Sequence, residues 1–282
     1  MLNYSITDDE FNTISELSEK LTGIKLTESK KALIIARLSA TLRKLDLNSF
    51  SEYINFLQTD GTQEDIKFFI NRITTNETSF FREKHHFDFL KSKILHELLE
   101  QKISSGNLNL RVWSAACSTG EEPYSLAITI LEYFKGKIGY DIKILASDLS
   151  TSVLDVASKG EYNIEDLKNS VPHDLIHKYF HKVNHEVYRI NDEVKRLISF
   201  RQINFLDERY PLKSKVDIVF CRNALIYFDD TIRDMIVTRF YNHLNVPGFL
   251  FVGHSENLFR HSQKFKLISN TTYSKIHSSG DM

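Results

Sequence analysis

Cysteine, proline and glycine are scarce in this chain of 282 residues, which has two, four and ten of them. Two cysteines cannot build a disulfide framework and they lack the spacing of a metal site, so we expect reduced thiols and a cytoplasmic location. Glycine and proline, which interrupt helices and strands, are few, and the chain has 20 phenylalanines and 12 tyrosines. This composition excludes a linker-rich or disordered chain. The chain is long enough to bury a large core.

An excess of one charge and long apolar runs are also missing. The 36 Lys and Arg residues balance 37 Asp and Glu, which argues against electrostatic binding of nucleic acid by the whole chain. No stretch approaches the roughly 18 apolar residues that span a bilayer. The amino-terminal residues do not follow the basic-then-apolar pattern of a secretory signal. We therefore expect no nucleic-acid partner and no direct membrane insertion. We also expect a monomer.

Helical spacing changes to strand–helix alternation along the chain. Residues 1–73 carry a capping-box pattern at Thr7 and apolar residues three and four apart, which predicts an all-helical domain. Residues 74–282 alternate apolar runs with helical patterns, which predicts a mainly parallel α/β sheet with a small antiparallel hairpin inserted around 178–197. The predicted strands are Leu108–Trp113, Ile142–Ala146, Ile198–Ile203, Val216–Cys221 and Phe249–Val252, and the predicted helices are Glu122–Phe134, Ser150–Lys159 and Asp229–Leu244.

The turn after the first predicted strand is the most informative segment. Small residues follow Trp113, and a single glycine, Gly120, precedes Glu121, Glu122 and Pro123. A strand, a small-residue turn and a helix form the place where α/β sheets bind nucleotide-like ligands. Carboxylates at this turn would repel a pyrophosphate and attract a cation. The segment therefore favours S-adenosylmethionine, which carries an ammonium and a sulfonium, over a dinucleotide.

Polar residues end the next strands of the predicted sheet. Asp148 follows the second strand, where an acid can accept the hydroxyl groups of a ribose, or it can cap the next helix. Asn204 and Phe205 follow the third strand, where an amide and an aromatic ring could pair with and cover an adenine, or form an ordinary turn with Phe205 in the core. Arg222 and Asn223 follow the fourth strand.

Further candidates precede the first predicted strand or lie at the end of the fourth. Tyr227 could reach the transferred group, and Arg82 could clamp a carboxylate with its planar fork, or form a surface ion pair. Cys221 lacks an activating base, so we interpret it as a buried inert thiol. His85 and His86 lack a third ligand at plausible spacing, so we interpret them as structural rather than metal-binding.

Five of these segments, in this order and covering nearly the whole chain, resemble the CheR family of chemotaxis receptor methyltransferases. They are 75–82 (TNETSFFR), 112–125 (VWSAACSTGEEPYS), 146–148 (ASD), 220–228 (FCRNALIYF) and 253–257 (GHSEN). The resemblance implies a Rossmann-like methyltransferase domain that uses S-adenosylmethionine and no metal. It also implies esterification of glutamate side chains on the cytoplasmic helical bundle of chemoreceptors in membrane arrays, with S-adenosylhomocysteine as product, for sensory adaptation.

The resemblance also assigns roles to single residues. Those that correspond to cofactor contacts are Asn76, Thr78, Arg82, Glu122, Asp148, Asn204, Phe205, Arg222 and Asn223, while Arg82 and Tyr227 are expected nearest the methyl group. A basic helix face for receptor docking is expected from Lys30, Arg37, Arg43 and Lys44, with an ordinary solvated face as the alternative. The hairpin loop 182–187 lacks the glycine of members that bind a receptor tether, so we expect direct docking on receptor helices.

Two other functions compete with this interpretation. The chain could methylate a different acceptor, although 222–225 (RNAL) replaces the Asn/Asp-Pro-Pro-aromatic run of enzymes that methylate amino groups of bases. It could also bind S-adenosylmethionine without catalysis, as a regulator or scaffold, although Arg82, Asp148 and Tyr227 argue against that.

Overall fold

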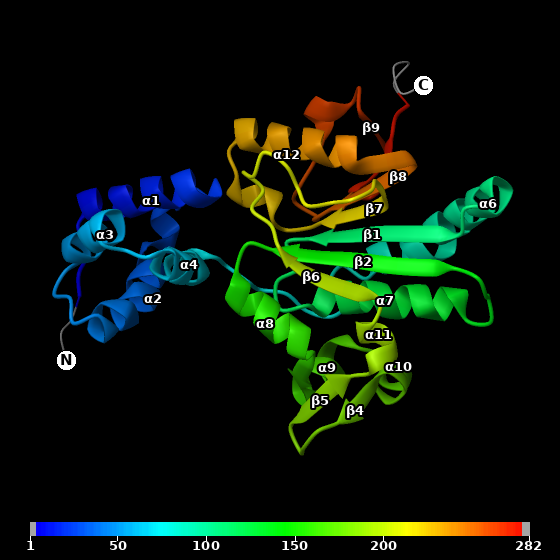
Figure 1. Ribbon diagram of the computed structural model, residues 1–282, viewed down its shortest axis with the longest axis horizontal. Coiled ribbons are helices and arrows are strands. Elements are labelled where there is room, and N and C mark those ends of the chain that lie inside the picture. The colour runs from blue at the N-terminus through cyan, green and yellow to red at the C-terminus, as the bar shows by residue number, and fades with distance from the viewer. Residues whose placement is uncertain (1–3, 278–282) are drawn as a thin grey trace.

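A helical unit lies beside one end of a mixed sheet in the computed structural model, which describes residues 4–277 (Figure 1). Thr7 begins the first helix with the predicted capping box: its hydroxyl accepts the Glu10 amide at 3.2 Å, and Glu10 accepts the Thr7 amide at 2.8 Å. Apolar faces of the helices pack into a core of their own, centred on Phe11, Ile34 and Phe69. The elements of this unit are α1 (Asp8–Thr22), the 3-10 helix η1 (Glu28–Lys30), α2 (Lys31–Lys44), α3 (Phe50–Thr59) and α4 (Gln63–Ile73).

The main sheet has the strand order β6-β2-β1-β7-β8-β10-β9 within residues 4–277. The first five strands pair in parallel, and β10 pairs antiparallel with β8 and β9. The prediction of a mainly parallel sheet is therefore confirmed, while the two antiparallel strands were not predicted. The strands are β1 (Asn109–Ala115), β2 (Asp141–Asp148), β6 (Ile198–Gln202), β7 (Val216–Cys221), β8 (Leu244–Val252), β9 (Phe265–Ser269) and β10 (Thr272–Lys275).

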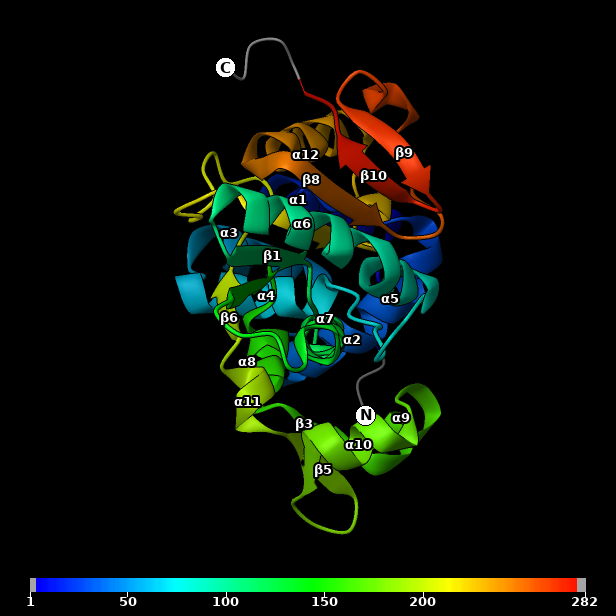
Figure 2. The ribbon, with the colours of Figure 1, turned by 90° about the vertical axis from the view of Figure 1, so that its right-hand side faces the viewer.

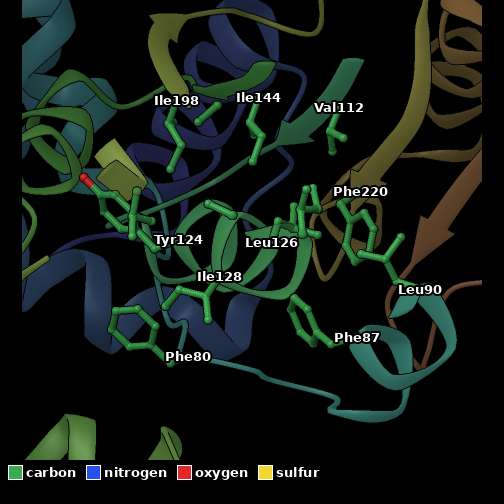
Figure 3. Packing of buried hydrophobic residues seen from close by; sticks show 14 of the residues in the cluster. Phe80, Phe87, Leu90, Val112, Tyr124, Leu126, Ile128, Ile144, Ile198 and Phe220 are labelled. Carbon is green, nitrogen blue, oxygen red and sulfur yellow. The ribbon is translucent and has the colours of Figure 1, made fainter. Parts of the chain in front are cut away.

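Helices cover both faces of the sheet because its central strands are apolar on both sides. Successive residues of β1 show the alternation: Val112 packs in the cluster with α7, and Trp113 packs in the cluster with α12. Figure 3 shows Leu126 and Ile128 of α7 between strand residues and Phe80 and Phe87 of the preceding segment. The covering helices are α5 (His85–Phe89), the π-helix η2 (Leu90–Ile94), α6 (Leu95–Ser105), α7 (Glu121–Phe134), α8 (Thr151–Lys159) and α12 (Asp230–His243), and of these α5, η2 and α6 were not predicted.

The inserted subdomain is larger than the hairpin predicted around 178–197. The hairpin is present, but it belongs to an antiparallel sheet with the order β3-β5-β4, and the insertion begins near Glu161. A strand as short as β3 shows no alternation that a sequence pattern could reveal. The subdomain protrudes from the sheet in two views (Figures 1 and 2). Its elements are β3 (Glu161–Asn163), α9 (Ile164–Ser170), α10 (His173–Tyr179), β4 (Phe180–Lys182), β5 (Val187–Ile190) and α11 (Asp192–Lys195).

Contacts between distant segments hold the helical unit against the carboxyl ends of the parallel strands. The Asn204 amide nitrogen, just after β6, donates to the Leu21 carbonyl oxygen of α1 at 2.8 Å. Ile24 forms an isolated antiparallel bridge with Phe228. The order of the sheet reverses between β1 and β7, and the crevice outside such a reversal is where α/β sheets bind ligands. The helical unit therefore forms one wall of that crevice.

Gly120 fixes how the insertion packs against the turn after β1. Its φ is +100°, and a Cβ there would lie 2.8 Å from the Tyr162 hydroxyl oxygen and 2.9 Å from the Ala157 Cβ. We expect Gly120→Ala to lower the free energy of unfolding by about 3 kcal/mol, measured by urea denaturation. Gly106→Ala is the matched control, because its φ is +69° with nothing within 4 Å, and it should cost about 1 kcal/mol. Equal losses would contradict the packing argument.

Candidate active site

A cavity of about 1010 Å³, including its part open to solvent, lies between the helical unit and the carboxyl ends of β1, β2, β6 and β7. The structure brings all ten predicted cofactor and catalytic residues to its wall, from segments up to 151 positions apart. They are Asn76, Thr78, Arg82, Glu122, Asp148, Asn204, Phe205, Arg222, Asn223 and Tyr227. Sequence reasoning did not place Lys30 in this cavity, and it also lines the wall.

Asp148 joins two loops at the bottom of the cavity. Its Oδ2 accepts the Ser118 amide at 2.8 Å, and its Oδ1 accepts the Ser150 amide at 2.9 Å. Burial raises the pKa of Asp148, opposed by these backbone hydrogen bonds. The helix cap of α8 is Ser150 rather than Asp148. Each carboxylate oxygen has a second lone pair, so Asp148 keeps acceptor capacity for a ligand hydroxyl.

Strained backbone surrounds that acid. Ala116 and Ser118, in the turn after β1, have φ values of +66° and +49°, a region that non-glycine residues rarely adopt. The Ser118 hydroxyl donates to the Asn76 carbonyl oxygen at 2.8 Å, which ties the turn to the segment before α5. Such strain persists where the surroundings over-determine it, typically at ligand sites.

Glu122 and Arg222 form a buried ion pair in the wall of the same cavity. Glu122 Oε1 accepts the Ser114 hydroxyl at 2.7 Å, and its Oε2 lies 3.2 Å from an Arg222 guanidinium nitrogen. Burial raises the pKa of Glu122, opposed by the Arg222 charge. Arg222 Nε and the Thr75 hydroxyl are buried without a hydrogen-bond partner among residues 4–277. Buried polar groups are nearly always satisfied, so these two wall residues indicate a polar ligand.

Arg82 is presented by a tight turn at the cavity mouth. Its neighbours Phe81 and Glu83 have φ values of +51° and +56°. The guanidinium is exposed and donates to the Glu77 carbonyl oxygen at 2.9 Å, while Arg222 donates to the Arg82 carbonyl oxygen. A rigid turn thus holds a planar cation at the entrance.

Tyr227 lies across the mouth in the 3-10 helix η3 (Leu225–Tyr227). The Lys30 ammonium stands 4.1 Å from the centre of its ring, a cation–π distance. Burial and the Arg37 charge lower the pKa of Lys30. No ion pair joins Lys30 to a carboxylate within residues 4–277. An unpaired, half-buried ammonium beside the phenol favours an anionic ligand at this end of the cavity.

Comparison with known proteins agrees with this geometry. The model of the CheR methyltransferase SAM-binding domain matches residues 76–274, and that of the CheR methyltransferase all-alpha domain matches residues 9–74. The chain belongs to the CheR methyltransferase family. It is 39% identical to a chemotaxis protein methyltransferase of Borreliella burgdorferi, covering 97% of this chain and 96% of that one.

Other relatives show the same extent of similarity. The chain is 39% identical to chemotaxis protein methyltransferase 2 of Pseudomonas aeruginosa (96% and 94% of the two chains) and to the chemotaxis protein methyltransferase of Escherichia coli (95% and 91%). Among solved structures, PKMT2 from Rickettsia typhi in complex with AdoHcy aligns with a TM-score of 0.32 and 20% identity, covering 51% of this chain and 20% of that one. In residues 4–277 no helix has the length and apolarity to cross a membrane.

Two residues that the CheR resemblance assigned to the cofactor are already engaged. The Asn204 side chain donates to the Leu21 carbonyl oxygen and accepts the Leu206 amide at 3.0 Å. Phe205 packs in the core with Tyr210, Phe228 and Phe240 while also lining the cavity. The adenine contacts of Asn204 and Phe205 therefore remain predictions. In the structure Asn204 holds the helical unit, and Phe205 packs in the core.

The predicted CheR-type docking face is divided by the structure. Lys30 turns to the cavity, and Arg37 donates to the Thr74 carbonyl oxygen at 2.7 Å and to the Arg72 carbonyl oxygen at 3.3 Å. Arg43 and Lys44 are exposed. The seven-residue spacing of Lys30, Arg37 and Lys44 therefore does not produce one free basic stripe, because Lys30 lies over the Tyr227 ring in the cavity and Arg37 is held by backbone carbonyl oxygens.

His85 and His86 do have a third possible ligand, contrary to the sequence interpretation. Ligand atoms of Glu83, His85 and His86 lie within 4.8 Å of one another. Burial and the Arg222 charge lower the pKa of His86 to about 4, and a neutral imidazole is the form that binds a metal. The Arg222 guanidinium, however, lies 3.3 Å from Glu83 Oε2. A buried cation already paired with this carboxylate opposes a metal cation at the same place, which favours the structural role.

Proposed function

We propose that this CheR-family chain transfers the methyl group of S-adenosylmethionine to glutamate side-chain carboxylates of chemoreceptors. The observation that carries the proposal is the polarity of the cavity. In the inner part, the two buried acids Glu122 and Asp148 outnumber the buried Arg222. At the mouth, the cations Arg82 and Lys30 outnumber Glu77 beside Tyr227. A cationic cofactor suits the acids, and an acceptor carboxylate suits the cations.

The chain's own residues supply positioning rather than proton transfer. A glutamate acceptor is already ionised at neutral pH, so its oxygen attacks the methyl carbon, the carbon–sulfur bond breaks, and the electron pair stays on sulfur. Asp148 would hold the ribose, and Glu122 the ammonium. Arg82 and Tyr227 would align the acceptor with the methyl group, because alignment is the main contribution available to such a displacement.

Lys30 is expected to act on the acceptor and not on the cofactor. Lys30→Gln removes the unpaired charge at the mouth, and we expect it to raise KM for a receptor fragment about threefold to tenfold with the Kd for S-adenosylmethionine unchanged. Lys20→Gln is a matched control, since it replaces an exposed lysine of the same helical unit outside the cavity. If Lys30→Gln bound S-adenosylmethionine more weakly, the Lys30 ammonium would instead contact the carboxylate of the cofactor.

Arg43 and Lys44 are proposed to contact the receptor bundle from outside the cavity. Reversing both to Glu should weaken association most at low salt, because exposed charges are screened over about 8 Å at physiological ionic strength. Arg37 is left out of this test because it holds the chain after α4.

Docking is proposed to occur at cytoplasmic receptor arrays without a tether, because the hairpin loop 182–187 has no glycine. A receptor lacking its C-terminal tail should therefore be methylated nearly as well as the intact one.

The proposal is tested by methyl transfer from radiolabelled S-adenosylmethionine to soluble receptor cytoplasmic fragments. Label is expected on the fragment with the parent chain, and strongly reduced label with Tyr227→Phe. Binding of S-adenosylmethionine without transfer to any fragment would support the non-catalytic alternative.

A further inference from the structure

Glu256 belongs to the 253–257 segment, one of the five that resemble the CheR family. It is a buried acid that does not line the cavity. Its exposed fraction is 6%. Its Oε2 accepts the Asn223 amide at 3.0 Å and the Gly253 amide, and its Oε1 accepts the Ile226 amide at 3.2 Å. One carboxylate thus joins the loop after β8 to the loop after β7.

The 3-10 helix that carries Tyr227 needs a distant cap. The first amides of a helix have no partner within it. Ala224 occupies the cap position and has no side-chain oxygen to accept them. Glu256 fills this place from 30 residues further along the chain, through Ile226. Leu225 of the same turn is buried, and Arg233 donates to the Leu225 and Phe228 carbonyl oxygens. Glu256 thus holds the amino end of the turn that carries Tyr227, and Arg233 holds its carboxyl end.

Close packing leaves the carboxylate little freedom. A Cβ at Gly253 would lie 2.7 Å from the Asn223 amide nitrogen and 2.9 Å from Glu256 Oε2. Asn223 has a φ of +57°, a left-handed conformation that asparagine adopts more readily than most residues, and in this conformation its backbone amide donates to Glu256. A glutamine at position 256 would direct an NH2 group at backbone N–H donors, since both oxygens accept hydrogen bonds.

We infer that Glu256 is a positioning residue for methyl transfer, which caps the Leu225–Tyr227 turn and so sets Tyr227 at the cavity mouth. The inference rests on the proposed function only for the reaction that is measured. It predicts that Glu256 acts mainly through Tyr227, and that its effect on cofactor binding, through the Asn223 backbone amide that it also holds, is smaller than its effect on turnover.

Kinetics of Glu256→Gln, alone and combined with Tyr227→Phe, test the inference. Glu256→Gln should lower kcat at least about tenfold, with the cofactor Kd within about threefold of the parent value. In the Tyr227→Phe background the same change should cost no more than about twofold, because residues that act as one unit are not additive. An equal factor in both backgrounds, or a loss of cofactor affinity as large as the loss of kcat, would overturn it.

Asp217→Asn separates positioning from stability. Asp217 is a buried carboxylate at the other end of β7, where it accepts the Arg111 amide at 2.8 Å and pairs with Lys102 at 3.0 Å. The Asp217→Asn variant should have a lower Tm. Its kcat should stay near the parent value when all variants are measured well below their Tm. If Glu256→Gln does not fold, Glu256→Asp replaces it with the same expectation, because the shorter side chain cannot reach both loops.

Hydrogen exchange distinguishes failure of this inference from failure of the proposed function. Amides of residues 223–227 should exchange faster in Glu256→Gln than in the parent chain, and Asp217→Asn should leave them unchanged. This readout needs no acceptor protein. A parent chain that transfers no methyl to receptors would refute the proposed function, while unchanged exchange at 223–227 would refute the role of Glu256.

Discussion

The Arg82→Ala variant is expected to turn over about 100-fold more slowly than the parent chain, with its affinity for S-adenosylmethionine changed less than about threefold. Arg82 stands at the cavity mouth on a turn flanked by two residues of positive φ, and its carbonyl oxygen is held by Arg222. A backbone position fixed in this way suits Arg82 to orient the acceptor. Steady-state kinetics and calorimetry would measure the two quantities.

Arg72→Ala is the control for a lost surface arginine. Its guanidinium lies 4.8 Å from the Phe68 ring centre, outside the cavity, so we expect kcat to stay within about twofold. Should Arg82→Ala weaken cofactor binding as strongly as it slows turnover, Arg82 would belong to the cofactor site rather than to the methyl end.

For Asp148→Ala we expect S-adenosylmethionine to bind roughly 10- to 100-fold more weakly, which corresponds to about 1–3 kcal/mol for unpaired buried polar groups. The acid is the buried acceptor at the end of β2, and its two oxygens already order the loops that carry Ser118 and Ser150. Calorimetry gives the affinity directly.

A purely structural role for Asp148 predicts something different. The Tm without cofactor would fall, while the cofactor Kd measured at low temperature would stay near the parent value. Ser150→Ala is the matched change, because it alters the cap residue of α8 and leaves the carboxylate in place. It should change the cofactor Kd by less than about twofold.

The central strands could be predicted because burial on both faces makes them continuous apolar runs, as in β7, where every residue is buried. The amino-terminal half of β8 was not predicted, since Asn245 and Pro247 interrupt the apolar pattern. Strands β9 and β10 lie at the end of the sheet, and exposed Lys266 and Leu267 break the alternation of β9. Pattern alone does not show which half-buried segments pair.

The site was predictable where one motif held the chemistry and not where tertiary contacts decide it. Asp148 and Glu122 follow strands, so their place at one edge of the sheet follows from topology. The approach of Lys30 to Tyr227 depends on how the helical unit docks, through Leu21 and Asn204. Glu256 accepts hydrogen bonds from backbone amides. Every residue except proline has a backbone amide, so the sequence does not indicate which of them Glu256 contacts.

The chemistry of the methyl group on the receptor distinguishes esterification of glutamate from methylation of an amine. Receptor fragments labelled by the parent chain would be digested and mapped by mass spectrometry, before and after mild base. We expect methyl groups on glutamate side chains, released as methanol by base, and none on fragments in which those glutamates are replaced by alanine. Methyl groups that resist base, on lysine or another amine, would contradict it.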